Sequence, residues 1–254
     1  MKRDIFSLKG KTFLITGGSR GIGKAVSLQF ARAGAKIIAN YVRDIKAAEK
    51  MLAETQKENL SMILLRADLT GAKGLEKIKQ AIDELKEPLS GFIHCAATGV
   101  HKPLSELTSR HFDLIFALNV RAFFELVNLL LPNFTEGASI VAVSSAGARR
   151  AVPSYAFIGS SKAALESLAR HMAAELAPKN IRVNILLPGS VLTDAWKAMP
   201  DSERRIKNTI SRTPLKRLVT AEDVAKAALF LCSDASSGVV GQTLIVDGGA
   251  SITE

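Results

Sequence analysis

The chain has 254 residues, of which 47% are apolar and 23% charged, and its formal net charge is +10. This composition predicts one domain with a large hydrophobic core and excludes a disordered or disulfide-stabilised chain. The two cysteines, Cys95 and Cys232, lack metal-ligand spacing, so we expect reduced structural thiols and no metal site. No stretch approaches a membrane span and the first residues do not resemble a signal peptide. We therefore expect a cytoplasmic protein without a membrane partner.

The positive charge is concentrated in one part of the chain. Residues 149–217 contain thirteen Lys or Arg and five Asp or Glu. Because no basic tail, zinc-finger spacing or aromatic RNA-binding motif accompanies them, we expect no nucleic acid partner. Two interpretations stay open: a solvated basic face, or a docking surface for an acidic partner. The residues expected at such a docking surface are Lys179, Arg204, Arg205 and Lys207.

Residues 11–23 (KTFLITGGSRGIG) combine an apolar run, a glycine-rich turn and the start of a helix. The run at 13–15 predicts a buried strand, and the glycines allow a tight turn and close approach of a ligand. A helix over 21–33 would direct its free backbone N–H groups and positive dipole end at the turn, which favours a pyrophosphate. The residues expected to form this cofactor-binding turn are Gly17, Ser19, Arg20, Gly21, Ile22 and Gly23.

The next segment indicates which cofactor is used. Residues 36–41 predict a second strand and residues 44–58 a helix, which completes a βαβ unit. NAD enzymes of this shape carry an acidic residue at the end of that strand, whereas Asn40 and Tyr41 stand here. Two guanidinium groups, Arg20 and Arg43, could reach a 2′-phosphate, although Asp44 is also near. The expected cofactor is NADPH, with Tyr41 and Arg43 among its contacts.

The remaining apolar runs complete an α/β pattern. Further strands are expected at 62–67, 91–96, 139–144, 181–187 and 242–246, and apolar helices at 106–131 and from about 159. This pattern predicts a Rossmann-type doubly wound sheet of about seven parallel strands, with helices on both faces. We expect a single domain over residues 1–254, with a substrate lid at about 194–214 because that segment combines charges, two prolines and little periodicity.

These motifs resemble, in order and spacing, the short-chain dehydrogenase/reductase superfamily. The resemblance rests on Thr16 before the glycine turn, the sequence ALNVRA around Asn119, Lys162, and the PGxVxT stretch at 188–193. It implies that Asn119 holds a water in a proton path, that Lys162 binds the nicotinamide ribose, and that the protein is a homotetramer. Further cofactor contacts implied by it are Asp68, Leu69, Ala96, Pro188, Gly189, Val191 and Thr193. The family's Asn-Asn-Ala-Gly sequence is here His94-Cys95-Ala96-Ala97, and we expect His94 and Cys95 to be core residues.

The position of the tyrosine separates branches of that superfamily. In the common carbonyl reductases the active tyrosine lies four residues before the lysine, where this chain has Ile158. A hydrocarbon cannot replace a phenol as a proton donor. Tyr155 lies seven residues before Lys162, as in the enoyl-acyl-carrier-protein reductases that this stretch resembles. Ser145 matches the family's other active-site position. A tyrosine that merely caps the helix is the competing interpretation, and it would leave Lys162 without a catalytic partner.

The sequence therefore predicts an NADPH-dependent enoyl-acyl-carrier-protein reductase of fatty acid elongation. Its expected catalytic residues are Tyr155, Lys162, Ser145 and Asn119, and its expected partner is an acyl carrier protein. One alternative is reduction of 3-ketoacyl or other carbonyl groups. A second is a cofactor-binding protein without catalysis.

Overall fold

A computed structural model describes residues 4–192 and 202–252. Its centre is a seven-stranded parallel sheet of order β3-β2-β1-β4-β5-β6-β7. The strands are β1 (Thr12–Thr16), β2 (Lys36–Tyr41), β3 (Met62–Arg66), β4 (Leu89–His94), β5 (Phe134–Val143), β6 (Arg182–Pro188) and β7 (Thr243–Val246). The strand order reverses between β1 and β4, where Thr16 lies beside His94. Ligands of such sheets bind outside the carboxyl ends of the strands at this reversal, so the predicted α/β fold is confirmed and its binding edge located.

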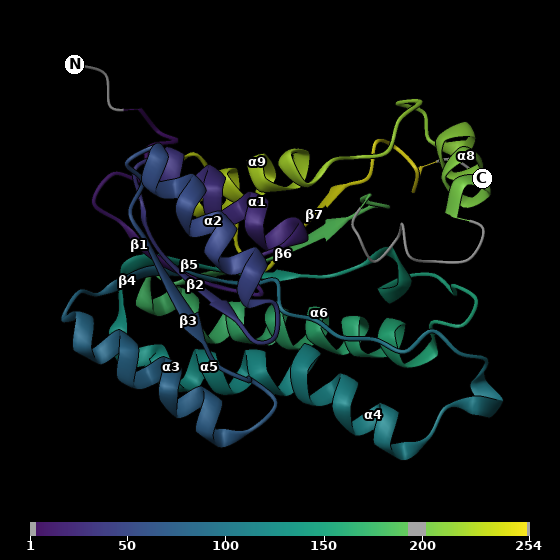
Figure 1. Ribbon diagram of the computed structural model, residues 1–254, viewed down its shortest axis with the longest axis horizontal. Coiled ribbons are helices and arrows are strands. Elements are labelled where there is room, and N and C mark those ends of the chain that lie inside the picture. Colours follow the sequence, from purple (N-terminus) through teal and green to yellow (C-terminus); the bar gives the residue numbers. More distant parts are fainter. Residues whose placement is uncertain (1–3, 193–201, 253–254) are drawn as a thin grey trace.

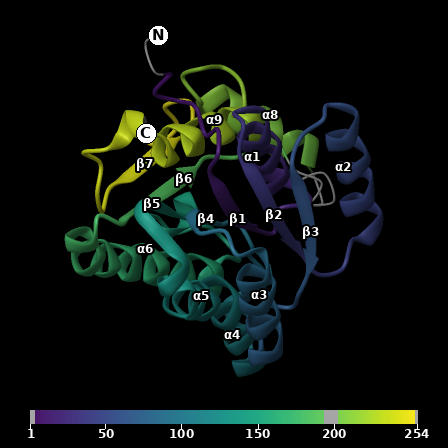
Figure 2. The ribbon, with the colours of Figure 1, turned by 90° about the vertical axis from the view of Figure 1, so that its left-hand side faces the viewer.

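Helices cover both faces of the sheet (Figures 1 and 2). One face carries α1 (Gly21–Arg32), α2 (Ile45–Lys57) and α9 (Ala221–Cys232), and the other carries α3 (Ala72–Leu85), α4 (Ser109–Phe116), α5 (Ala122–Leu130) and α6 (Ala156–Leu176). Helix α8 (Ser202–Arg212) lies at the far end, beside the residues that follow β7. Because both faces are covered, the strands are apolar on both sides, as in other parallel sheets.

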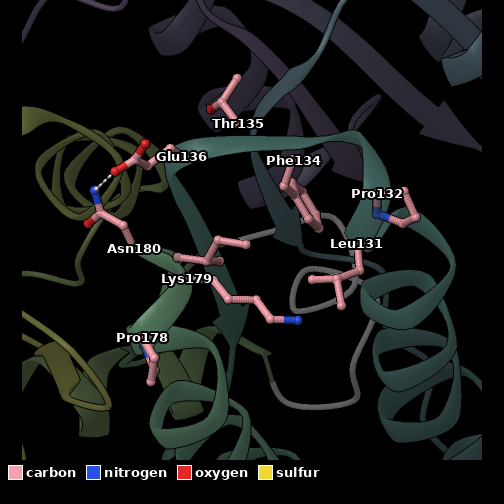
Figure 3. A pocket seen from close by; sticks show the side chains of 9 residues that line it. Leu131, Pro132, Phe134, Thr135, Glu136, Pro178, Lys179 and Asn180 are labelled. Atoms are coloured by element: carbon pink, nitrogen blue, oxygen red, sulfur yellow. Dashed lines mark hydrogen bonds between the residues drawn. The ribbon is translucent and has the colours of Figure 1, made fainter.

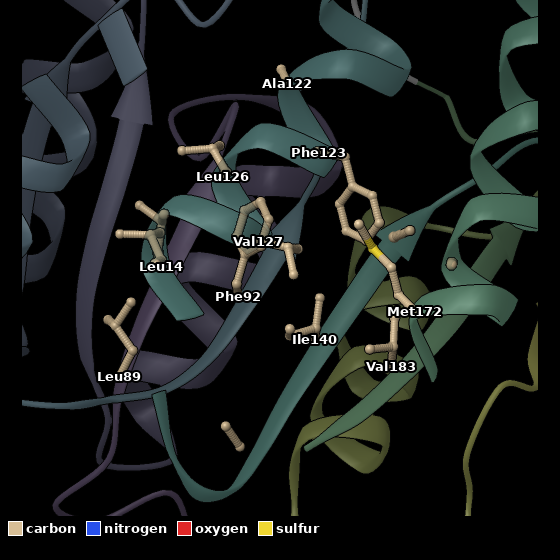
Figure 4. Packing of buried hydrophobic residues seen from close by; sticks show 14 of the residues in the cluster. Leu14, Leu89, Phe92, Ala122, Phe123, Leu126, Val127, Ile140, Met172 and Val183 are labelled. Atoms are coloured by element: carbon tan, nitrogen blue, oxygen red, sulfur yellow. The ribbon is translucent and has the colours of Figure 1, made fainter. Parts of the chain in front are cut away.

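Two hydrophobic clusters lie on the two sides of the sheet. Figure 4 shows the cluster beneath α5 and α6, where Phe92 of β4 packs 5.9 Å from the ring of Phe123 of α5. On the other side, Phe13 of β1 contacts Phe30 of α1 edge to face. Each such ring is fully buried and contributes about 2 to 3 kcal/mol by leaving water. These contacts hold the carboxyl ends of β1, β4 and β5 in a rigid frame.

The helix expected at 106–131 is interrupted. It consists of α4, a π-helical turn (Ala117–Arg121) and α5, followed by a 3-10 turn that ends at Asn133. The helical run 109–133 is long and apolar enough to cross a membrane, so the expectation that no stretch approaches a span was wrong. The core helix of a soluble protein passes the same test, and α5 packs its apolar side chains into the cluster of Figure 4. The π turn, often found at functional sites, places Asn119 inside the protein.

Other boundaries also differ from the expected ones. Helix α6 begins at Ala156, three residues earlier than expected, which places Tyr155 at its N-cap position. The predicted lid, residues 194–214, contains the regular helix α8, and its residues 194–201 lie outside the described ones. The movement of this segment therefore stays a prediction. Helices α3 and α9 have no counterpart among the expected elements.

Candidate active site

The glycine turn after β1 has the geometry that a pyrophosphate requires. Gly17 has a φ of 61°, and a Cβ atom there would lie 3.0 Å from the backbone of Ala96. A Cβ at Gly23 would overlap the carbonyl oxygen of Gly17. Helix α1 starts at Gly21, and its N-cap residue Arg20 makes no side-chain capping bond. The Arg20 side chain thus leaves the first N–H groups of α1 uncapped, and pyrophosphate binding there stays a prediction.

Polar groups near the end of β2 bear on the predicted preference for NADPH. The buried Asn40 amide donates to the carbonyls of Ala67 and Leu65, so it ties β2 to β3. The nearest carboxylate, Asp44, caps α2 by accepting a hydrogen bond from the backbone N–H of Ala47 at 2.9 Å. Asp44 therefore caps the helix and does not stand in for the acidic residue that binds the ribose in NAD enzymes.

The two predicted guanidinium groups are exposed. Within the described residues, neither Arg20 nor Arg43 has an ion pair or a side-chain hydrogen bond. Tyr41 is half-buried at the end of β2, two residues before Arg43. Both guanidinium groups are thus accessible to a bound 2′-phosphate.

The predicted adenine contacts lie after β3. Asp68 is exposed and its Oδ1 accepts hydrogen bonds from the N–H and hydroxyl of Thr70. Leu69 is almost fully buried, so its side chain belongs to the core and only its backbone can face a ligand. Asp68 has its second carboxylate oxygen left for a ring amine.

A chain of hydrogen bonds fixes the loop after β4. The Thr16 hydroxyl accepts from the N–H of Ala96 at 3.2 Å and donates to His94 Nδ1 at 3.0 Å. His94 Nε2 in turn donates to the carbonyl of Leu118 at 3.1 Å. Burial and the nearby Lys162 charge lower the His94 pKa to about 3, so the ring is neutral. The core role expected for His94 is confirmed. Because the N–H of Ala96 bonds to Thr16, only the carbonyl of Ala96 is left for the expected cofactor contact, which stays a prediction.

Cys95 is the other departure from the family sequence. Burial raises the pKa of its thiol to about 12, so it stays protonated and unreactive. Among the described residues, no cluster of three or more potential metal ligands exists.

Asn119 joins the loop after β4 to α6. Its amide nitrogen donates to the carbonyl of Thr98 at 3.1 Å and to the hydroxyl of Ser161 at 2.9 Å. Its oxygen accepts from the N–H of Thr98 at 2.9 Å. Both amide hydrogens are therefore used, which leaves no side-chain donor for the predicted water. A water at this residue would have to donate to its oxygen or bind its backbone.

Lys162 is buried on α6. Its amine donates to the carbonyl of Val143, the last residue of β5, at 2.8 Å. Burial lowers the Lys162 pKa to about 8, so the amine is mostly charged at neutral pH. The lysine thus places a cation at the carboxyl end of β5, where Val143 lies two residues before Ser145 in the chain.

Ser145 and Tyr155, which the sequence predicts as catalytic residues, lie side by side. Their hydroxyl oxygens lie 3.1 Å apart. The Ser145 oxygen also accepts from the N–H of Gly147 at 3.3 Å, so its own hydrogen can donate to the phenol. Burial raises the Tyr155 pKa, and the Ser145 hydrogen bond opposes that rise. When Ser145 is the donor of this pair, the phenol hydrogen is free to donate to a ligand.

Tyr155 lines an open groove of about 510 Å³. Its ring packs on Gly147, where a Cβ atom would come within 2.5 Å of it, and lies 5.4 Å from the ring of His101. The groove combines apolar side chains, such as Leu104 and Val152, with the cations Lys102, Arg149 and Arg150. It is suited to a molecule with both apolar and anionic parts.

Ile158 lies in the interior and is buried. A Cβ atom on Gly99 would overlap its side chain, so Ile158 fills the space beneath the loop after β4. The position four residues before Lys162 thus holds a packed hydrocarbon.

The predicted nicotinamide contacts follow β6. Pro188 ends that strand, Gly189 donates its N–H to the carbonyl of Val246 at 2.8 Å, and Val191 pairs with Val219. Thr193 lies outside the described residues. Pro188, Gly189 and Val191 are therefore brought to the binding edge that holds Lys162.

Comparison with known proteins decides the family. The family model described as Enoyl-(Acyl carrier protein) reductase matches residues 17–251. 1-Cyclohexenylcarbonyl-CoA reductase of Streptomyces collinus is 34% identical over 241 residues, which cover 94% of this chain and 86% of that protein. The chain belongs to the short-chain dehydrogenase/reductase superfamily. 7α-Hydroxysteroid dehydrogenase of Escherichia coli K12, another relative, is 36% identical over 251 residues, covering 97% and 96% of the two chains.

Solved short-chain dehydrogenase/reductase structures have the same fold. A 7α-hydroxysteroid dehydrogenase complexed with NADH and 7-oxo glycochenodeoxycholic acid has a TM-score of 0.92, 36% identity and 98% coverage of both chains. A gluconate 5-dehydrogenase of Burkholderia cenocepacia, in complex with NADP and tartrate, has a TM-score of 0.89 at 28% identity, again covering 98% of both chains. This short-chain dehydrogenase/reductase is therefore an oxidoreductase.

Sequence reasoning missed several groups at this superfamily's binding edge. His101 and Gly147 contact Tyr155, and Glu166 supports the loop that carries Ser145. Their contacts join distant parts of the chain. A histidine seven residues after a strand and a glycine two residues after an active-site serine were the only local signals.

A second cavity lies at the opposite edge of the sheet. It has a volume of about 580 Å³ and is lined by residues that flank the starts of β5 and β6, among them Phe134, Glu136 and Lys179 (Figure 3). Lys179 precedes β6, whereas α8 follows it, and the residues directly after α8 pack near Gly248 beyond β7. Parallel strands separate these two ends, so the expected docking surface that joined Lys179 to Arg204 and Lys207 was wrong. The Arg205 side chain is not among the described ones.

Proposed function

We propose that this protein reduces the carbon–carbon double bond conjugated to a thioester carbonyl, with NADPH as the reductant. The observation that carries the proposal is the position of the phenol. Tyr155 contacts Ser145, while Ile158 occupies the position of the carbonyl reductase tyrosine. The relative from Streptomyces collinus supports it, because the compound in its name has a ring double bond next to a CoA thioester carbonyl.

The chain's own residues fit a nicotinamide dinucleotide. The turn at Gly17 and Gly23 admits a pyrophosphate, and Arg20 and Arg43 suit the 2′-phosphate of NADPH. The neighbours bound to NADP or NADH support the cofactor class. When bound, the reduced nicotinamide supplies a hydride.

In the proposed reaction, Tyr155 donates its hydrogen to the thioester oxygen, where negative charge develops as the β-carbon is reduced. A preorganised donor of this kind is usually the largest single contribution to such catalysis. Ser145 donates to the phenol oxygen and so directs the phenol hydrogen outward. Lys162 binds the ribose and adds positive charge.

The enolate then takes a proton from water at its α-carbon. Asn119 supports that step by holding Thr98 and Ser161 in place. Because both of its amide hydrogens are already used in these bonds, a water in the proton path cannot accept a hydrogen bond from the Asn119 side chain.

Reduction of a ketone is the second candidate. The larger share of the similarity favours it, because the 7α-hydroxysteroid dehydrogenase relative and its 7-oxo complex concern a hydroxyl or oxo group. Against it stands Ile158, which offers no proton where the ketone reductases have a phenol. The third interpretation, a binding protein without catalysis, does not explain the hydrogen bond between Ser145 and Tyr155.

One assay separates the three. NADPH oxidation is followed at 340 nm with crotonyl and acetoacetyl thioesters of N-acetylcysteamine, which need no carrier. The proposal predicts faster oxidation with the crotonyl thioester. Faster oxidation with acetoacetyl thioester supports the second candidate, and none with either, despite NADPH binding, supports the third.

The proposed natural substrate is linked to an acidic acyl carrier protein. Arg204 and Lys207 are exposed on α8, beside the carboxyl ends of the strands. Reversing both charges should raise KM for the carrier-linked substrate and leave N-acetylcysteamine thioesters unaffected. Lys179→Glu is the control, because Lys179 lies at the opposite edge and should have no effect. Equal losses with both substrates would point to damage to the groove.

We also propose a homotetramer. The helical run α4 to α5 exposes Phe112, Leu114 and Phe124 by about two fifths each (41%, 43% and 43%), apolar side chains that further copies of the chain can cover. Light scattering after gel filtration would measure the mass, and a monomer would refute the proposal.

A further inference from the structure

Glu166 is a buried carboxylate that the proposed reaction does not use. It lies on α6, four residues after Lys162, and is 4% exposed. Its Oε1 accepts from the hydroxyl of Ser144 at 2.6 Å. Its Oε2 accepts from Nε and Nη2 of Arg149 at 3.2 and 3.1 Å, with Arg170 at 4.0 Å. A buried carboxylate keeps its hydrogen-bond donors in one arrangement, because the release of any donor leaves the carboxylate poorly paired.

These bonds hold both ends of one short loop. Ser144 directly precedes Ser145, and Arg149 directly follows the 3-10 turn Ala146–Ala148. Between them lie the Ser145 hydroxyl, which contacts the phenol, and Gly147, on which the Tyr155 ring packs. Glu166 therefore clamps the surface against which the phenol rests, although it does not itself contact Tyr155.

We propose that Glu166 is a positioning residue that acts through Ser145, keeping the Ser145 hydroxyl aligned with the Tyr155 phenol. The proposal rests on the proposed role of Tyr155. It does not depend on whether the substrate is an enoyl thioester or a ketone.

Several charged or titratable groups surround the phenol and must be separated from this effect. Lys162 lies on α6 and His101 on the loop after β4, while Lys102, Arg149 and Arg150 line the same groove. Loss of the Glu166 charge, or release of Arg149, would stabilise a phenolate directly and lower the Tyr155 pKa. Loss of the Ser145 hydrogen bond would raise it, because that bond favours the ionised form. The two mechanisms thus have opposite signs.

The chain permits a direct measurement, because it contains only two tyrosines. In a Tyr41→Phe background without cofactor, the tyrosinate absorbance reports Tyr155 alone. The experiment measures the shift in this titration caused by Glu166→Gln, first with Ser145 present and then with Ser145→Ala. Direct electrostatic effects occur in both backgrounds, so the difference between the shifts isolates the part that passes through Ser145.

We expect this difference to be an upward shift of the Tyr155 pKa. In turnover, Glu166→Gln should lose about 2- to 10-fold in kcat, the value of one neutral hydrogen bond. Its KM for NADPH should be nearly unchanged. Glu175→Gln is the matched control, because Glu175 is an exposed carboxylate on the same helix. A zero or downward difference, in variants that keep the wild-type circular dichroism and NADPH affinity, would overturn the positioning role. Because the titration needs no turnover, it stands even if enoyl reduction is not observed.

Discussion

Removing the two exposed guanidinium groups should abolish most of the preference for NADPH over NADH. Arg20 and Arg43 are free of side-chain partners in the described part of the chain, but both are exposed. Solvent reduces each charge–phosphate contact to about 1 kcal/mol, below the value of a buried charged hydrogen bond. Two contacts therefore predict a preference of about 30-fold in kcat/KM, and about 5-fold should be lost with each of Arg20→Ala and Arg43→Ala.

The assay compares kcat/KM for NADPH and NADH at two ionic strengths. Because the contacts are solvent-exposed, the preference should shrink as salt is added. Arg32→Gln is the control: it lies at the other end of α1, about 18 Å along the helix, and pairs with Glu58. Equal kcat/KM for the two cofactors in the wild type, or an equal effect of Arg32→Gln, would refute this reasoning.

Three further predictions concern single side chains. Tyr155→Phe should lower turnover by about 10² to 10³ without changing NADPH affinity in a fluorescence titration, and Ser145→Ala should cost less; an unchanged rate would exclude Tyr155 as the donor. NADPH binding should weaken as pH rises through about 8, because Lys162 is charged below its pKa and neutral above it; the same dependence in Lys162→Ala would assign the effect elsewhere. Arg182→Met should lower the free energy of unfolding in urea by about 2 to 4 kcal/mol, because the buried guanidinium donates to three carbonyls at and beyond the end of α9. An equal loss in the exposed control Arg170→Met would show that these hydrogen bonds are not the cause.

The fold could be read from the sequence because a parallel sheet covered on both faces needs continuous apolar strands. The expected strand at 36–41 coincides with β2. Strand β5 begins at Phe134, five residues before its expected start. Its first residues are not uniformly apolar, and Phe134 joins the sheet by pairing with Leu89 of β4. Local pattern carries no information about such a partner.

The site was predictable where its chemistry depends on spacing along one helix or turn. The seven residues from Tyr155 to Lys162 and the glycines after β1 are of this kind. The Glu166 clamp was not, because its partners come from the end of β5 and the loop after it. Lys179 was assigned to the wrong edge because a count of charges along the chain does not show on which end of a strand they lie.

The central claim, that the phenol at position 155 serves reduction of a conjugated double bond, is tested most directly by competition. Equimolar crotonyl and acetoacetyl thioesters are incubated with NADPH carrying deuterium at the transferable position, and the products are separated by mass spectrometry. We predict that monodeuterated butyryl thioester forms first and in large excess. Deuterated 3-hydroxybutyryl thioester as the main product, with crotonyl thioester untouched, would contradict the account.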